Sequence, residues 1–205
     1  VQGPEITQFR PGKLYAGSSD VAVDIRGRNF RKRARVYVGD GAQLNFPVDR
    51  KHIRFRNSNR LVVTLTDGLN RLLTKPGAIK FQVVNPNTAD GVRSEDQSIN
   101  VVGPRIADAR FEVMQDDDSH VMLVIDGANF LKGAIVEFFK PGMDAAPVSQ
   151  LVPVDLKSRR ISTPVRLKKI ERLGNFKLRV VNQGTVPVPS VLFQPRMNHL
   201  AQRRD

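Results

Sequence analysis

An internal repeat is the sequence feature that most constrains the fold of this chain. Residues 23–30 (VDIRGRNF) return 100 positions later as residues 123–130 (LVIDGANF). Residues 3–6 (GPEI) return at the same offset as residues 103–106 (GPRI). Segments that recur in the same order indicate two diverged copies of one structural unit.

The offset between the two copies drifts along the chain. Residues 47–49 (PVD) return at 153–155, an offset of 106, and residues 77–85 (GAIKFQVVN) return at 174–182 (GNFKLRVVN), an offset of 97. The second copy therefore carries an insertion around 141–147 and deletions after it. We predict two homologous domains followed by a short C-terminal tail, with the bounds 1–102, 103–194 and 195–205.

Each copy alternates apolar and polar residues with the period of a β-strand. Val21, Val23 and Ile25 are separated by residues of the opposite face, and the same period recurs several times in each copy. Turn-forming pairs such as Asp40-Gly41 separate these segments. About seven short strands in ~100 residues are typical of a β-sandwich. Leucine or isoleucine residues at helical spacing predict one helical turn in each copy, at 69–73 and 167–173.

Composition excludes several classes of chemistry. The 205 residues include no cysteine and no tryptophan, which excludes disulfides, thiolate metal sites and the Cys-Trp-Cys signature of antibody domains. The chain has 33 Lys plus Arg against 20 Asp plus Glu, a formal net charge of +13, and this excess raises the question of an anionic partner. No apolar run approaches the ~20 residues of a membrane helix.

The repeated residues resemble the IPT/TIG family of immunoglobulin-like domains. The resemblance rests on a Gly-Pro-x-Ile start, a V-x-I-x-G-x-N-F core and a late P-G-x-x-x-F-x-V-V-N-P element, and it covers most of both copies. The second copy departs from the pattern at Leu173 and Gln183, where the family favours proline. The first copy carries it on Gly3, Pro4, Ile6, Pro11, Val23, Ile25, Gly27, Asn29, Phe30, Val36, Val38, Pro76, Gly77, Phe81, Val83, Val84, Asn85 and Pro86. The second copy carries it on Gly103, Pro104, Ile106, Leu123, Ile125, Gly127, Asn129, Phe130, Val136, Gly174, Leu178, Val180, Val181 and Asn182.

This resemblance implies an all-β fold class of two tandem, early-set immunoglobulin-like β-sandwiches with about seven strands each. Domains of the family occur in cell-surface receptors and in bacterial extracellular proteins, as spacers or binding modules. They also occur beside carbohydrate-active domains and as dimerisation domains of Rel-type transcription factors. Fold alone does not fix function.

The repeated G-x-N-F element has a structural interpretation. The glycine allows a special backbone conformation at the end of a strand, the asparagine hydrogen-bonds local backbone in a turn, and the phenylalanine closes the end of the sandwich. These positions are Gly27, Asn29 and Phe30 in the first copy and Gly127, Asn129 and Phe130 in the second.

The search for catalytic chemistry finds no known motif. There is no G-x-S-x-G elbow, H-E-x-x-H pair or G-x-x-x-x-G-K-[ST] loop, so we predict that the chain is not an enzyme and has no cofactor. The candidate metal ligands are Asp116, Asp117 and Asp118, because hard cations prefer clustered carboxylate oxygens. The EF-hand spacing is absent, and a solvated loop is the favoured interpretation. We interpret His52, His120 and His199 as structural or exposed.

The basic residues form three groups, around 26–35, 50–60 and 159–172. Residues 1–102 hold 17 basic and 9 acidic residues (net +8), and residues 103–205 hold 16 and 11 (net +5), so the charge is not confined to one tail. Decoration of strand edges against aggregation is the favoured interpretation. The alternative is an anionic-ligand patch on the first copy, with the members Arg31, Lys32, Arg33, Arg35, Tyr37 and Lys80.

Nucleic acids and neutral glycans are the less favoured ligands, because both are usually bound on exposed aromatic side chains. Phe55, Phe81 and Phe138 are expected to point inward, which leaves Tyr37 as the clearest outward aromatic. The expected partner is a protein or an anionic polysaccharide, and the chain is expected to be a monomer or weak oligomer.

The sequence therefore predicts a non-catalytic spacer or binding module of a larger protein, bacterial and either exported or on the cell surface. The alternative is an intracellular protein-interaction or nucleic-acid-associated domain pair that resembles the dimerisation domain of Rel-type factors. An export signal upstream of Val1 would favour the first, and a DNA-binding domain there would favour the second.

Overall fold

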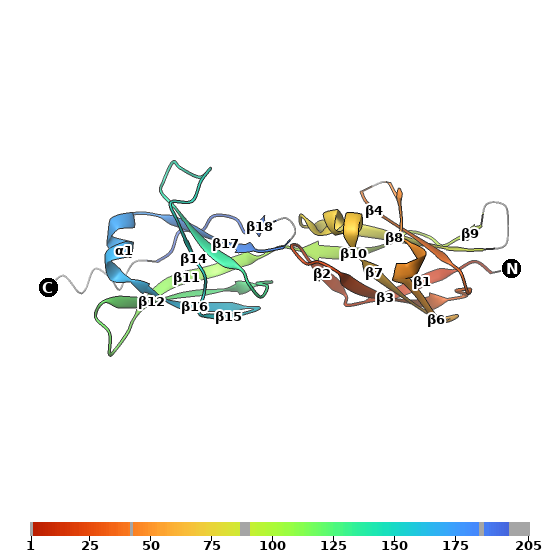
Figure 1. Cartoon of the computed structure of the whole chain (residues 1–205), viewed down its shortest axis with the longest axis horizontal. Helices are drawn as coiled ribbons and strands as arrows, with labels where there is room; N and C mark the ends of the chain where they lie inside the picture. Colours follow the sequence, from red (N-terminus) through yellow and green to blue (C-terminus); the bar gives the residue numbers. More distant parts are fainter. Residues whose placement is uncertain (1, 42, 87–90, 185–186, 197–205) are drawn as a thin grey trace. The chain divides into compact units, whose positions relative to one another are not determined.

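The alternating segments of the sequence form the central strands of four β-sheets, two in each half of the chain, in a computed structural model (Figure 1). The structure describes residues 2–41, 43–86, 91–184 and 187–196. The chain divides into two compact units, the first built on the residues up to Val102 and the second beginning at Gly103. Within the described part of the chain, no helix is long and apolar enough to span a membrane.

The first unit is a sandwich of two sheets with the strand orders β1-β3-β7-β6 and β2-β10-β8-β4-β5. Two sheets with this order are the arrangement of an immunoglobulin-like sandwich, in which the chain moves between sheets after its first strand. One sheet contains β1 (Glu5–Arg10), β3 (Val21–Arg28), β7 (Arg60–Leu65) and β6 (Ile53–Asn57). The other contains β2 (Lys13–Tyr15), β10 (Gln97–Val102), β8 (Gly77–Asn85), β4 (Arg35–Asp40) and β5 (Phe46–Pro47), with β9 (Val92–Arg93) beside β8.

The second unit repeats most of this topology, without strands equivalent to β2 and β10 among its described residues, in the strand orders β11-β12-β16-β15 and β14-β13-β17-β18. One sheet contains β11 (Arg105–Val113), β12 (His120–Ala128), β16 (Arg160–Arg166) and β15 (Asp155–Lys157). The other contains β14 (Ser149–Leu151), β13 (Ile135–Phe139), β17 (Lys177–Asn182) and β18 (Val188–Pro189). The all-β tandem sandwich expected from the sequence is confirmed.

Strand pairing in the second unit continues past β18. Phe193 exchanges backbone hydrogen bonds with Leu178, and the Arg196 amide donates to the carbonyl of Ala109. The last described residue, Arg196, thus lies in a paired position, although the sequence placed it in a tail of residues 195–205. Residues 197–205, which include His199, lie outside the described residues.

Both predicted helical turns are present. In the first unit η2 (Asp67–Leu73) is a 3₁₀ helix, and in the second α1 (Leu167–Leu173) is an α-helix. A second 3₁₀ turn, η1 (Arg50–His52), precedes β6. Each of η2 and α1 connects two strands of opposite sheets and so lies at one end of its sandwich.

Period-two alternation identified the buried faces of the central strands. Val23, Ile25 and Phe81 are fully buried in the first unit, and Phe138 packs 5.5 Å from Phe176 in the core of the second. The expectation for Phe55 is wrong, because this side chain is 37% exposed. Its strand, β6, is the edge of its sheet and buries almost none of its residues.

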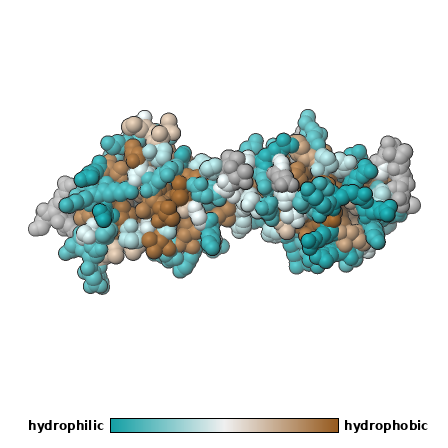
Figure 2. Space-filling model, viewed as in Figure 1, coloured by the Kyte–Doolittle hydropathy of each residue, from teal (hydrophilic) through white to brown (hydrophobic). Residues whose placement is uncertain are grey.

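Each unit leaves a different kind of surface open to solvent. Figure 2 shows hydrophilic residues over much of the visible face of the first unit, whereas apolar residues gather on the visible face of the second. In the connection between β14 and β15, Val152 and Val154 are 72% and 78% exposed.

The repeated glycine is required by close packing. A Cβ atom on Gly27 would lie 1.8 Å from the Glu5 carbonyl oxygen and 2.5 Å from the Phe30 ring, and one on Gly127 would meet the corresponding atoms of the second unit. Neither glycine has a positive φ. Our expectation of a special backbone conformation is therefore corrected: these positions lack a side chain because the first strand and the phenylalanine approach too closely.

The repeated asparagines form one hydrogen-bonded network in each unit. Asn29 has a φ of 59° and donates from Nδ2 to the Gly3 carbonyl. Asn85, 3% exposed, donates from Nδ2 to the Asn29 carbonyl and accepts at Oδ1 from the Arg31 amide. Asn129 and Asn182 repeat these contacts in the second unit. The motif therefore holds the loop between β3 and β4, or β12 and β13, against the last residue of β8 or β17.

Candidate anion-binding site

A cavity of about 580 Å³ opens in the second unit where α1 lies beside the end of β13 and the start of β14. Most of the side chains that line it are cationic. We call this cavity the basic cleft. Its cations are Lys140, Arg166, Lys168, Lys169 and Arg172, and its other lining residues are Val148, Ser149 and Leu173.

The packing of α1 explains why so many cations surround the basic cleft. Ile170 is buried and anchors the helix in the core, and Leu167 and Leu173 pack partly against the same core. With one apolar side of the helix fixed in this way, Lys168 and Arg172 remain exposed to solvent. Lys169 is half-buried, and its Nζ lies 5.6 Å from the centroid of the buried Phe138 ring.

The cations of the basic cleft have no carboxylate partner among the described residues. Six of the nine other described Lys and Arg residues of this unit form ion pairs, among them Arg110 with Asp126, Lys177 with Asp144, and Arg179 with the buried Glu137. None of the five cleft cations takes part in the ion pairs of the described residues. Five of the eight cations of this unit that form no ion pair among the described residues thus lie around one cavity.

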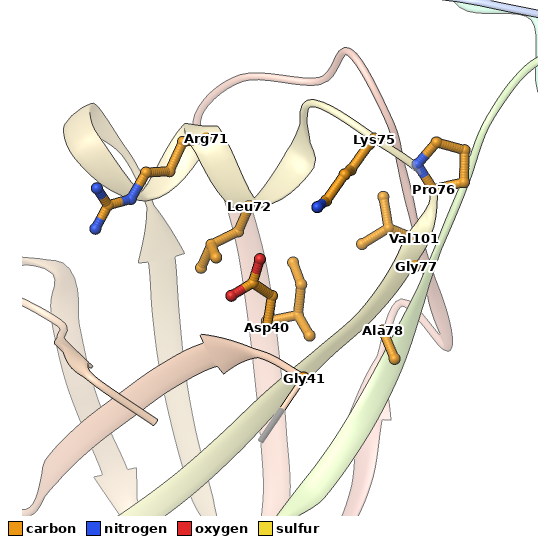
Figure 3. A pocket seen from close by; sticks show the side chains of 10 residues that line it. Asp40, Gly41, Arg71, Leu72, Lys75, Pro76, Gly77, Ala78 and Val101 are labelled. Carbon is orange, nitrogen blue, oxygen red and sulfur yellow. The ribbon is translucent and has the colours of Figure 1, made fainter. Parts of the chain in front are cut away.

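The first unit has a cavity of about 350 Å³ beside its own helical turn, η2, and the end of β4, and this cavity is lined further by the start of β8 and by Val101 of β10. Asp40 lies there at the position that Lys140 occupies in the second unit, 100 residues later. Figure 3 shows the Asp40 carboxylate inside this cavity, with the Lys75 ammonium directed toward it and Arg71 directed away. Arg71 instead stacks over the Phe46 ring, with its guanidinium carbon 4.0 Å from the ring centroid.

The predicted patch of the first unit is divided between two places. Arg35, Tyr37 and Lys80 share the outer face of the β4–β8 pair, where Tyr37 stands opposite Gln82 in the register. Lys80 is paired with Asp96 at 3.7 Å, so part of the charge of this face is neutralised. Arg31, Lys32 and Arg33 are exposed in the loop that precedes β4, at the opposite end of the strand from Asp40.

The aspartate loop is organised by hydrogen bonds. Asp117 accepts from the amide and hydroxyl of Ser119, at 2.8 and 2.6 Å, and its other oxygen lies 2.7 Å from Nδ1 of His120. The Ser119 hydrogen bonds lower the pKa of Asp117 to about 2. The described residues include Asp116 and Asp118. Among these residues, no group of three or more His, Cys, Asp or Glu side chains is arranged so that it could hold a metal ion.

Ser119, His120 and Asp117 do not have the geometry of a catalytic triad. The Ser119 hydroxyl lies 2.9 Å from Nδ1 of His120, the same nitrogen that contacts Asp117. In a triad the serine and the aspartate bind opposite ring nitrogens, so that a proton can pass through the imidazole. These three residues form a turn before β12, as expected for a loop rich in turn formers.

Sequence reasoning noted the basic residues around 159–172 but missed that Lys140 and Ser149 join four of them. Lys140 directly follows β13 and α1 begins 27 residues later, and only the connection from β16 across to β17 brings them to one cavity. The usable signal was the charge difference at equivalent positions of the repeat, Asp40 against Lys140.

No protein-family model matches the chain, and no curated protein sequence matches it. Among solved structures, domains A168–A170 of titin align with a TM-score of 0.32 at 14% identity, over 95% of this chain and 66% of that one. The I9–I11 tandem of titin aligns with a TM-score of 0.36 at 9% identity, over 96% and 65%. The human OSCAR ligand-binding domain aligns with a TM-score of 0.33 at 13% identity, over 95% and 100%. The chain thus spans slightly less than two thirds of both titin structures. Strand order and register place each unit among immunoglobulin-like sandwiches.

Proposed function

We propose that the chain is a non-catalytic binding module of a larger exported or cell-surface protein, and that both units are IPT/TIG domains. The repeated asparagines and glycines on which the family resemblance rests stabilise the sandwich. Asn85 and Asn182 hold the loops, and Gly27 and Gly127 admit the first strand, in the same way in both units.

The observation that carries a binding role is the unpaired positive charge of the basic cleft. Like charges gathered around a cavity repel one another and are stabilised when an anion enters. A cavity of about 580 Å³ is also within the size range of ligand sites in proteins. Both features favour a partner that brings negative charge to the module.

Retention of the whole chain on immobilised polymers tests this function. We expect retention on heparin at ~0.3 M NaCl, a concentration at which nonspecific ionic contacts are greatly weakened. Neutral dextran of the same bead type should not retain the chain. Elution from both resins at low salt would contradict the binding role. The non-catalytic role would be contradicted by turnover of ester, glycoside or phosphoester substrates that co-purifies with the chain and is lost on a single substitution.

A further inference from the structure

We infer that the basic cleft of the second unit is the docking site for an acidic polysaccharide, and that Asp40 prevents the equivalent cavity of the first unit from binding the same ligand. This inference rests on the proposed binding function and adds to it the place and the class of the ligand. It replaces the patch of the first unit that the sequence suggested with a site in the other unit.

The distribution of charge in the second unit points to this cleft. Several cations on its sheets form ion pairs where they stand, such as Arg110 with Asp126 and Glu112, and Arg179 with Glu137. The cleft brings five cations from two strand ends and a helix to one cavity without a carboxylate in its lining. A surface selected only for solubility would intersperse both signs, whereas this surface separates them.

The position of two of these lysines is unfavourable for the local structure. Lys168 and Lys169 lie in the first turn of α1, where there is no acidic residue and where positive charge opposes the helix dipole. The residue before the helix, Arg166, forms no side-chain cap and adds a third positive charge. Residues that lower the stability of their own helix or strand are expected at functional sites.

The shape and lining of the cleft favour a polysaccharide among anionic ligands. Val148 and Leu173 provide an apolar surface for the C–H face of a sugar ring, and Ser149 offers a hydroxyl among the cations. None of the lining residues is aromatic, whereas proteins that bind single-stranded nucleic acids stack the bases on aromatic side chains. The five cations come from three segments of the chain, the residue after β13, the end of β16 and α1, and such a spread suits sulfates or carboxylates that are distributed along a chain of sugars.

The equivalent cavity of the first unit shows what excludes the ligand. It has the same position beside the helical turn, and Lys75 and Arg71 are in its lining, but Asp40 takes the place of Lys140. A carboxylate inside the cavity repels the sulfates or carboxylates of the ligand, and it attracts Lys75, which is directed toward it (Figure 3). The lining of this cavity thus has two cations and one carboxylate, against five cations and no carboxylate in the basic cleft.

The test measures the affinity of the whole chain for a fluorescein-labelled heparin octasaccharide by anisotropy, at several salt concentrations around 0.15 M. The cleft variant carries Lys140→Glu and Arg172→Glu, both at exposed positions. We expect its affinity to fall about 100-fold and the slope of log affinity against log salt to decrease by about 2. The control variant carries Arg31→Glu and Arg33→Glu, the same charge change in an exposed loop of the first unit, and should stay within about threefold of the unchanged chain.

Three outcomes would overturn part or all of the proposal. Equal losses in the two variants would overturn the cleft as the site and leave the binding function standing. Absence of heparin binding by the unchanged chain would contradict the proposed function itself. Equally tight binding of a DNA oligonucleotide or of anionic lipid vesicles, lost in the cleft variant, would overturn the polysaccharide as occupant. Both variants must unfold at the same temperature as the unchanged chain. If the charge-reversed cleft variant does not fold, the variant with Lys140→Ala and Arg172→Ala replaces it in the same measurement.

Discussion

Each of the two units has a cavity beside its helical turn, η2 or α1, yet the charges of the two cavities differ. Asp40 ends β4 and Lys140 directly follows the equivalent strand β13, and each side chain lines its cavity. The buried network around Asn85 and Asn182, in contrast, is the same in both units. The residues that hold the sandwich are thus the same in both units, whereas those that face the cavity differ. If the proposed binding function holds, this difference is where the two units are expected to differ in ligand binding.

The largest expected effect tests whether the shared framework is equally important in both units. Asn85→Ala and Asn182→Ala each leave one backbone amide and one backbone carbonyl without a partner, and each should lower the free energy of unfolding of its unit by about 2–4 kcal/mol. Hydrogen exchange followed by mass spectrometry reports the two units separately. The exposed Asn100→Ala in β10 is the control. If each substitution lowers hydrogen-exchange protection by a similar amount in its own unit only, the framework is equally important in both units. A large loss of protection in one variant with none in the other would show that it is not.

The next effect concerns the position that distinguishes the cavities. Lys140→Asp should lower affinity for the heparin octasaccharide about tenfold, because it removes one favourable contact and adds a repulsive one. Asp40→Lys should give the first unit a second binding site beside Arg71 and Lys75. Calorimetry would then show the number of octasaccharides per chain rising from one to two. If Asp40→Lys gains a second site but Lys140→Asp keeps its affinity for the octasaccharide, the charge at this position is not what distinguishes the two cavities.

A smaller effect depends on pH and on a feature confined to the second unit. Because hydrogen bonds lower the pKa of Asp117 to about 2 in the folded chain, its ionised form stabilises the fold above its ordinary pKa of 3.8. This contribution is lost as the pH falls from about 4 toward 2. Asp117→Asn should therefore be less stable at pH 7, with the difference vanishing near pH 2 in urea unfolding. Asp116→Asn removes the same charge from the loop without breaking these hydrogen bonds, and a matching loss there would point to loop charge alone.

The smallest effect on stability concerns the edge of the first unit. Arg54 and Arg56 are exposed on β6, a longer edge strand than β15, its equivalent in the second unit. Replacing both with threonine should change the free energy of unfolding by less than about 0.5 kcal/mol. The same change should promote association between sheet edges, measured by light scattering at high protein concentration. No increase in scattering would show that these arginines have a task other than protecting the edge.

The central strands and the repeat could be read from the sequence because burial on one face imposes period two. Edge elements could not: β5, β9 and β18 have two residues each, too few to show a period. Phe55 was predicted to point inward for a different reason. Its strand, β6, does alternate, but an edge strand can alternate without either of its faces being covered. Ser94 and Ser190 each accept a hydrogen bond from the backbone of the neighbouring strand, a role that only alignment of the two copies could have suggested.

The candidate site was harder to predict than the fold. Four of its cations stand close together in the sequence, but a run of basic residues has the same appearance on a solvated face as around a cavity. The deciding contribution came from Lys140 at the end of another strand, which only the three-dimensional crossing of the chain brings near α1. Charge pairing also depends on distance in space: Lys80 was expected to belong to an anion patch, and Asp96 neutralises it.

The buried asparagine network has a consequence for how these domains can be altered. Asn85 and Asn182 hold the loop between β3 and β4, or between β12 and β13, through backbone atoms of that loop, so that Arg31 and Leu131 make the same contact at 3.0 Å despite their different side chains. The side chains of Arg31, Lys32 and Arg33 are exposed and form none of these contacts. A foreign peptide grafted there would be displayed in a fixed backbone conformation, which makes this sandwich a ready scaffold for engineered recognition.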